Sequence, residues 1–215
     1  LFCKDDLTVN GNGSLTVNAG FHNGIGTKDD LLIVSGAYTV KAANHGLRGN
    51  DSVTVLGGGF HITAGNDGIQ TNNAEDAGKG FIAIEDGVFS ILAAHDGMQA
   101  DQTVDIYGGE FTITAGGGAS PAAAASPDTA SDSFKGIKTA GSIQITGGRF
   151  TVDSYDDSVH ANGSILIDGG DFTLRTGDDA VHADGDLTIR GGSMAVLQSY
   201  EGLEANTIAI SGGTI

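Results

Sequence analysis

Acidic residues recur in this chain at one place in a repeated motif. The motif reads NDGIQTN at 66–72, HDGMQAD at 95–101, DDSVHAN at 156–162, DDAVHAD at 178–184 and YEGLEAN at 200–206. Aligning these copies gives two columns of oxygen-bearing side chains. The first column contains Asp67, Asp96, Asp157, Asp179 and Glu201, and the second contains Asn72, Asp101, Asn162, Asp184 and Asn206. Carboxylate and amide oxygens are the ligands that calcium prefers, at about 2.3–2.6 Å.

Two copies of the motif carry doubled carboxylates, Asp156-Asp157 and Asp178-Asp179. If such copies stack, their like charges raise each other's pKa unless a cation lies between them. The sequence therefore predicts Ca²⁺ as the cofactor. The predicted ligands are Asp67, Asn72, Asp96, Asp101, Asp156, Asp157, Asp178, Asp179, Asp184 and Glu201. The alternative is that these side chains cap turns by accepting backbone N–H groups, which is favoured for any single aspartate but does not require the doubled ones.

A polar column on the same motif is a candidate platform for an extended polymer. It contains Gln70, Gln99, His160, His182 and Glu204. We predict that His160 and His182 contact sugar, and that Tyr155 and Tyr200, beside the acidic bend, stack on sugar rings. The alternative is that the histidines are solvent-facing ladder residues, or metal ligands, and that the tyrosines are half-buried at bends.

Catalysis has weaker support in the sequence. A polysaccharide lyase needs a base beside its metal to remove a proton from the substrate. The candidates are Lys79, Lys135 and Lys138, with Arg175 a poorer one. The chain has neither a G-x-S-x-G nor an H-E-x-x-H motif. We therefore predict that it is not an enzyme.

Large apolar side chains recur at a regular interval, which predicts how the motif copies are placed. The aligned residues are Tyr38, Phe60, Phe89, Phe111, Phe150, Phe172 and Met194. The steps between them are 22, 29, 22, 39, 22 and 22 residues, so the long steps read as one unit plus an insertion. Such a period marks a solenoid, in which each unit packs against its neighbours.

The content of one unit predicts the class of solenoid. In residues 52–71 alternating apolar residues indicate three short strands, separated by a run of glycines and an Asn-Asp-Gly bend. We predict an all-β fold, a right-handed parallel β-helix with about 22 residues per coil, whose neighbouring coils lie about 4.8 Å apart. A left-handed helix of hexapeptides is excluded because its coil repeats at about 18 residues.

The same period predicts one domain over residues 1–215, interrupted by surface insertions. One insertion extends the bend at 72–80, and a low-complexity one occupies 116–133, after which the repeat resumes at Phe134. The chain stops midway through a coil at 212–215. Since an open solenoid end is an adhesive edge, we expect further sequence or an oligomeric contact beyond it.

The amino-acid composition limits the classes of partner that the chain can bind. The chain of 215 residues has 27 acidic and 10 basic residues, a formal charge of −17. This charge disfavours nucleic acid and anionic membranes as partners and attracts metal cations. No apolar run approaches the roughly 18 residues of a membrane span. The lone Cys3 allows no internal disulfide and argues against a thiolate zinc site.

Several segments, in order, resemble one bacterial family. They are 3–9 (CKDDLTV), 23–31 (NGIGTKDDL), 70–80 (QTNNAEDAGKG), 178–184 (DDAVHAD) and 199–204 (SYEGLE). The chain is similar to the clostridial carbohydrate-binding β-helix family, extracellular proteins similar in shape to family-nine pectate lyases. The resemblance covers nearly the whole chain. The chain departs from the family at His45, which replaces an acidic residue, and around Lys135, which lacks an acidic pair.

The resemblance implies a parallel β-helix with bound calcium that binds plant cell-wall polysaccharide, acidic or cellulose-like, without established cleavage. Our hypothesis is a secreted, calcium-binding polysaccharide-binding module at the bacterial cell surface or outside the cell. A calcium-dependent pectate lyase and a structural adhesin or spacer are the alternatives.

Overall fold

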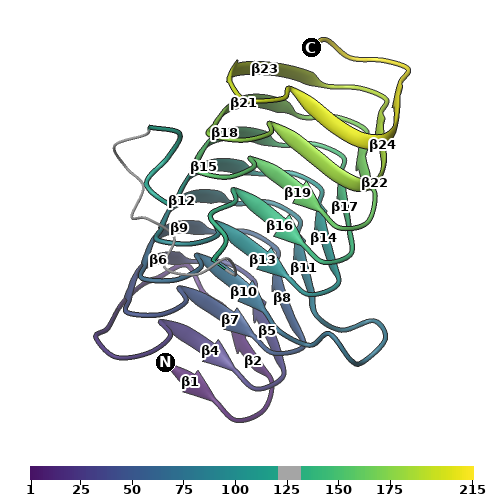
Figure 1. The fold of residues 1–215 in the computed structure, drawn as a ribbon. Helices are drawn as coiled ribbons and strands as arrows, with labels where there is room; N and C mark the ends of the chain where they lie inside the picture. Colours follow the sequence, from purple (N-terminus) through teal and green to yellow (C-terminus); the bar gives the residue numbers. More distant parts are fainter. Residues whose placement is uncertain (121–131) are drawn as a thin grey trace.

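The computed structural model describes residues 1–120 and 132–215, and in this part of the chain every regular element is a β-strand. The strands wind upward in parallel coils from the N-terminus to the C-terminus (Figure 1). Each complete coil contributes one strand to each of three faces. The predicted parallel β-helix with a coil of about 22 residues is confirmed. The described residues contain no helix that is long and apolar enough to cross a membrane.

The first face, which we call the motif face, carries the repeated motif. Its strands are β1 (Phe2–Cys3), β4 (Ile25–Thr27), β7 (Leu47–Gly49), β10 (Ile69–Thr71), β13 (Met98–Ala100), β16 (Ile137–Thr139), β19 (Val159–Ala161), the start of β22 (Val181–Ile189) and the start of β24 (Leu203–Ile210).

The second face follows one bend later in each coil. Its strands are β2 (Leu7–Val9), β5 (Asp30–Ile33), β8 (Ser52–Val55), β11 (Phe81–Ile84), β14 (Thr103–Ile106), β17 (Ser142–Ile145) and β20 (Ile165–Ile167). The long strand β22 pairs with both β19 and β20, so it joins the first two faces into one 16-stranded sheet.

The third face is a separate sheet of eight strands. Its strands are β3 (Ser14–Ala19), β6 (Ala37–Ala42), β9 (Gly59–Ala64), β12 (Val88–Ala93), β15 (Glu110–Ala115), β18 (Arg149–Ser154), β21 (Asp171–Thr176) and β23 (Ser193–Gln198). Alternate residues on these strands are buried and exposed, as expected where one face of a sheet packs on a core.

Aromatic rings stack along the inside of the third face. The predicted column from Tyr38 to Phe172 is continuous, and its ring centroids lie 4.6–5.0 Å apart with nearly parallel planes. Phe172 pairs in register with Met194, which ends the column. Rows of buried isoleucine, leucine and valine fill the rest of one continuous core. The stacking fixes the coil-to-coil register, because a shift of one residue would turn this column outward.

A glycine turn begins each strand of the third face. Gly58 has a φ of 124°, and a Cβ at this position would lie 2.8 Å from the carbonyl oxygen of Gly36. Both the backbone angle and the close approach of the neighbouring coil therefore require glycine there.

The insertions lie between strands, so the register continues across them. Residues 72–80 separate β10 from β11, and 116–133 separate β15 from β16. Residues 121–131 of the second insertion lie outside the described residues. Met98 pairs with Ile137, so the repeat resumes where the sequence predicts.

Candidate functional site: the bend and strands of the motif face

Aspartates of the first column form a hydrogen-bonded ladder at the bend before the motif face. Asp67 Oδ1 accepts the backbone N–H of Asp96 at 3.0 Å, and Asp96 Oδ1 accepts that of Lys135 at 2.7 Å. In the same way, Asp157 Oδ1 accepts the backbone N–H of Asp179 and Asp179 Oδ1 accepts that of Glu201, both at 3.0 Å. One oxygen of each aspartate therefore accepts a backbone N–H of the next coil. This is the turn-capping role that the sequence offers as the alternative to metal binding.

The second oxygen of each of the four buried aspartates faces a histidine or lysine side chain. Asp67 Oδ2 lies 3.1 Å from His45 Nδ1, out of line for a hydrogen bond, and Asp96 Oδ2 lies 3.5 Å from Lys138 Nζ. These carboxyl groups are almost completely buried. Burial raises the pKa of Asp96, because Lys138 only partly offsets the loss of water around the charge.

Lys135 interrupts the ladder where the column would otherwise carry an aspartate. Its ammonium group binds Asp156 Oδ2 and lies 3.2 Å from Asp157 Oδ2. The backbone N–H of Asp157 finds its acceptor in Asp156 Oδ1 instead, at 3.0 Å. A protein cation thus lies between the first pair of doubled carboxylates. Three oxygens of this pair are already hydrogen-bonded to the chain and the fourth faces Lys135 and His160, so a calcium ion fits here only by displacing Lys135.

The pKa shifts of this pair follow from the contact. Burial alone would lower the pKa of Lys135, but Asp157 and Asp156 outweigh it and raise the pKa. Burial alone would raise the pKa of Asp157, but the hydrogen bond from His160 and the charge of Lys135 lower it. Both groups are therefore held in their charged forms.

Further along the column the carboxylates have no lysine or arginine within 4 Å among the described residues. Burial and then the charges of Asp157 and Asp179 raise the pKa of Asp178. Burial and then a hydrogen bond with Asp179 raise the pKa of Glu201, and a hydrogen bond with Asp179 is the largest cause of the raised pKa of Glu204. The negative charge predicted for the doubled motif is thus uncompensated at its C-terminal end.

Members of the second column do not join the first column in a shared site. They lie past the other end of the short strand and bind its outward side chains. Arg48 donates to Asn72 Oδ1 at 2.5 Å, Gln99 donates to Asp101 Oδ1 at 2.9 Å, and His182 Nε2 lies 3.2 Å from Asp184 Oδ1.

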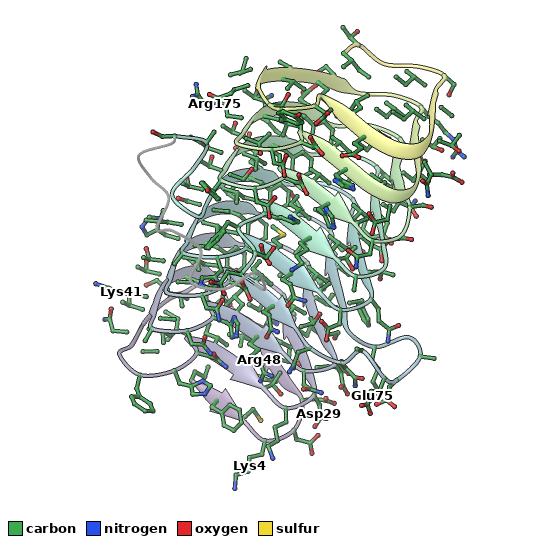
Figure 2. All side chains as sticks on the ribbon, in the orientation of Figure 1. Lys4, Asp29, Lys41, Arg48, Glu75 and Arg175 are labelled. Carbon is green, nitrogen blue, oxygen red and sulfur yellow. The ribbon has the colours of Figure 1, made fainter. Side chains whose placement is uncertain are left out.

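Outward side chains of the motif face form a straight row, which we call the polar track. Register pairs its members in order: Arg48, Gln70, Gln99, Lys138, His160, His182 and Glu204. The rings of His160 and His182 lie next to each other, with centroids 4.8 Å apart and planes tilted by 56°. All seven are at least partly exposed, and Arg48 marks the N-terminal part of the track in Figure 2. The track follows the axis of the solenoid, so a polymer along it meets one polar group per coil.

The two predicted stacking tyrosines differ in their surroundings. Tyr200 is 80% exposed at the bend and is free to stack on a ring. Tyr155 is only partly exposed and packs edge-on against Phe134, with ring centroids 5.6 Å apart. Tyr155 is therefore half-buried, as the alternative interpretation holds.

The three lysines among the candidate lyase bases contact aspartates. Lys79 Nζ binds Asp51 Oδ2 at 2.6 Å, and this hydrogen bond raises the pKa of Lys79. Lys135 and Lys138 contact the aspartate ladder, and Arg175 bonds Gln198 on the third face. A base must be unprotonated to accept a proton, and carboxylate partners favour the protonated lysine. This arrangement disfavours proton abstraction by Lys79 or Lys135.

A further acidic cluster lies at another bend and was missed by the motif alignment. Asp5, Asp6 and Asp29 bring carboxylate oxygens within 4.8 Å of one another near the N-terminus, where Figure 2 labels Asp29. Burial and the charges of Asp51, Asp5 and Asp6 raise the pKa of Asp29. The signal in the sequence is the segment Lys-Asp-Asp-Leu, which occurs twice, 24 residues apart. Oxygen-only donors without a lysine in contact fit a calcium ion here.

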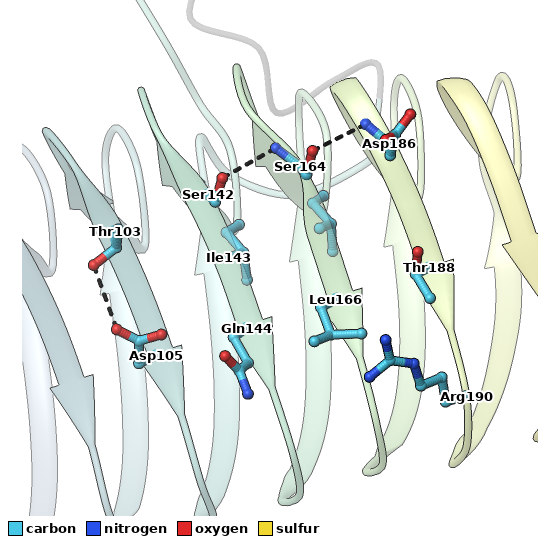
Figure 3. A pocket seen from close by; sticks show the side chains of 11 residues that line it. Thr103, Asp105, Ser142, Ile143, Gln144, Ser164, Leu166, Asp186, Thr188 and Arg190 are labelled. Carbon is cyan, nitrogen blue, oxygen red and sulfur yellow. Dashed lines mark hydrogen bonds between the residues drawn. The ribbon is translucent and has the colours of Figure 1, made fainter.

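The second face carries a shallow groove as another candidate surface (Figure 3). Ser142 accepts the N–H of Ser164, and Ser164 accepts that of Asp186, along its upper edge. Leu166 and Thr188 lie between this edge and Arg190. The groove is a mixed polar and apolar surface with few charged groups.

Comparison with known proteins gives a family match. The family model described as carbohydrate-binding domain-containing protein matches residues 1–180. A protein of the same description from Acetivibrio thermocellus is 60% identical over 42 residues, 20% of this chain and 15% of that protein. A solved structure, the polysaccharide lyase-like protein from C. thermocellum as a gadolinium derivative, is 26% identical with a TM-score of 0.41. It is matched over 100% of this chain and 55% of its own, so this chain spans only part of both relatives.

Proposed function

This chain belongs to the carbohydrate-binding domain-containing protein family, and we propose that it binds plant cell-wall polysaccharide along the polar track, with calcium as its cofactor. The family description names carbohydrate binding and no reaction. The observation that carries the choice of surface is the straight row of polar side chains on seven successive coils, from Arg48 to Glu204. Amide, imidazole and charged groups in such a row suit the hydroxyl and carboxylate groups of an extended glycan.

An acidic or a cellulose-like glycan is the proposed ligand. Arg48 and Lys138 lie in the track and offer cations for uronate groups, although the chain as a whole carries −17. Calcium, when bound, supplies positive charge that both orders the acidic bends and bridges them to carboxylates of the polymer. Tyr200 at the end of the bend column supplies an exposed ring for stacking.

Calcium is proposed first at Asp5, Asp6 and Asp29, where the donors are oxygens and no lysine fills the cluster. The first-column residues Asp67, Asp96 and Asp157 already face His45, Lys138 and Lys135. At Asp178 and Glu201 the uncompensated charge leaves room for an added cation. We place the protein outside the cell or on the bacterial cell surface, where plant polysaccharide is accessible.

Affinity electrophoresis of the full chain in gels containing polygalacturonate or soluble cellulose derivatives tests the proposal. We expect retardation with calcium and its loss with EDTA on the acidic polymer. Gln70→Ala and Gln99→Ala should each weaken binding about five-fold, the effect of losing about one net hydrogen bond. Thr112→Ala and Thr151→Ala, which alter exposed side chains of the third face, are the matched controls and should change nothing.

Other outcomes contradict the proposal in different ways. A loss of binding in Gln144→Ala, with Gln70→Ala and Gln99→Ala unaffected, would place the ligand in the groove of the second face. No retardation on any glycan would favour the spacer or adhesin. Unsaturated products released from polygalacturonate, seen as new absorbance, would favour the lyase. Undiminished binding with EDTA would remove calcium from the interaction.

A further inference from the structure

His182 on the motif face has its outer ring nitrogen bound to a carboxylate. His182 Nε2 lies 3.2 Å from Asp184 Oδ1. An ionised carboxylate only accepts hydrogen bonds, so Nε2 carries the proton of this bond. In the neutral ring Nδ1 is then an acceptor with a free lone pair, and this nitrogen points back toward the aspartate ladder.

More acceptors surround Nδ1 of His182 than a neutral ring can satisfy. Asp179 Oδ2 lies 3.3 Å from it, Glu204 Oε2 3.4 Å and Asp157 Oδ2 3.8 Å. In the part of the chain that the structure describes, none of the three contacts is aligned as a hydrogen bond. Three carboxylate oxygens and one imidazole lone pair that converge in this way form a cluster that a bound cation stabilises.

His160 repeats the arrangement one coil earlier. Its Nε2 lies 3.0 Å from Asn162 Oδ1, and its Nδ1 lies 2.8 Å from Asp157 Oδ2. Both rings are thus held at the outer nitrogen by the residue two positions on, and both present the inner nitrogen to the same aspartate. Histidines that bind metals are oriented in this way by a hydrogen bond at the other nitrogen.

We propose that His182 Nδ1, Asp179 Oδ2 and Glu204 Oε2 bind a divalent first-row transition metal ion, with zinc as the representative. These ligand atoms lie within 4.8 Å of one another. Bonds of about 2.0–2.1 Å in tetrahedral geometry separate neighbouring ligands by about 3.3–3.4 Å. The nitrogen–oxygen distances of 3.3 and 3.4 Å match this separation.

The imidazole ligand separates this site from the calcium sites proposed above. Calcium takes oxygen ligands, whereas imidazole nitrogen suits zinc and its neighbours in the first row. Asp179 is buried while the Glu204 side chain is 52% exposed, so one side of the cluster is open to solvent. Three protein ligands and one open position leave room for water or a ligand donor. The proposal does not depend on glycan binding.

Isothermal titration of the full chain with zinc chloride, in buffer with excess calcium, tests the site. We expect one equivalent of zinc per chain that calcium does not displace. His182→Gln should weaken zinc binding by about 100-fold or more, since it removes a ligand. His61→Gln is the matched control: this histidine is exposed on β9 of the third face and forms no ion pair with any described residue. Its zinc affinity should equal that of the unaltered chain.

A second variant keeps the test independent of folding defects. Asp184→Ala leaves all three ligands in place and removes only the group that orients His182, so we expect about ten-fold weaker zinc binding. Cobalt in place of zinc should give a visible absorption that is lost in His182→Gln. The proposal is overturned if zinc does not bind, if calcium displaces it, or if both His182→Gln and Asp184→Ala leave the affinity unchanged.

Discussion

Lys135 Nζ lies 3.2 Å from Asp157 Oδ2, at the place on its coil where the neighbouring coils carry an aspartate. The contact replaces one rung of a carboxylate ladder with a salt bridge between a buried aspartate and a mostly buried lysine. It also explains how Asp156 and Asp157 lie side by side without an added ion. The local chemistry of the bend therefore changes from one coil to the next, although the backbone repeats.

Replacement of Lys135 by glutamine should destabilise the fold. The change leaves Asp156 and Asp157 facing each other without a cation, and breaking a buried ion pair from one side costs about 3 kcal/mol or more. Urea unfolding monitored by circular dichroism measures the loss. Lys41→Gln is the control, because Lys41 is exposed on the third face and forms no ion pair with any described residue.

Calcium should restore part of the stability lost in Lys135→Gln and have less effect on the unaltered chain. The vacated position offers oxygen donors from Asp156, Asp157 and Asp178, which lie within 4.8 Å of one another. An equal midpoint for Lys135→Gln and the unaltered chain in EDTA would show that the salt bridge contributes nothing to stability.

Periodicity predicts which residues stack, and for that reason the fold can be predicted from the sequence. The column from Tyr38 to Met194 and the bend column from Asp67 to Glu201 both align in the structure as the spacing predicts. Spacing does not predict which way a carboxylate oxygen points. Residues of the second column bond to side chains of the polar track and not to the first column. Lys135 contacts two aspartates because its side chain is long, which an alignment does not reveal. Asp5, Asp6 and Asp29 lie one or two residues beyond the second-column position, so the aligned motif does not include them.

The hydrogen-bonded aspartate ladder predicts that two substitutions of Asp96 differ in their effect on stability. Asp96→Asn keeps an oxygen for the N–H of Lys135 and removes a charge that burial makes unfavourable, so stability should change little. Asp96→Ala leaves that partly buried N–H without an acceptor and should cost about 2 kcal/mol. Equal unfolding midpoints for the two variants in urea would contradict the capping role.

The aromatic column predicts a large loss of stability when a ring at its centre is removed. Phe89 is 1% exposed and stacks on Phe60 and Phe111 at 4.6 and 4.8 Å. Phe89→Ala should reduce the free energy of unfolding by about 3–5 kcal/mol, since it opens a cavity between two rings. Phe89→Leu keeps most of the volume and should cost less. Denaturant unfolding compares the two, and equal costs would show that lost volume does not determine the effect.

The raised pKa of Glu204 predicts that replacing this residue changes stability in a pH-dependent way. Asp179 raises the pKa of Glu204, so the folded state binds this proton more readily than the unfolded chain does. The charged glutamate therefore opposes folding above its unfolded pKa of about 4.3, and the penalty disappears as pH falls below that value. Without metal, Glu204→Gln should raise the melting temperature at pH 7 and have no effect near pH 3. Glu85→Gln is the control, because Glu85 is exposed and forms no ion pair with any described residue, and it should leave the melting temperature at pH 7 unchanged. A lower melting temperature for Glu204→Gln at pH 7 in EDTA would mean that Glu204 stabilises the bend, contrary to the direction of its pKa.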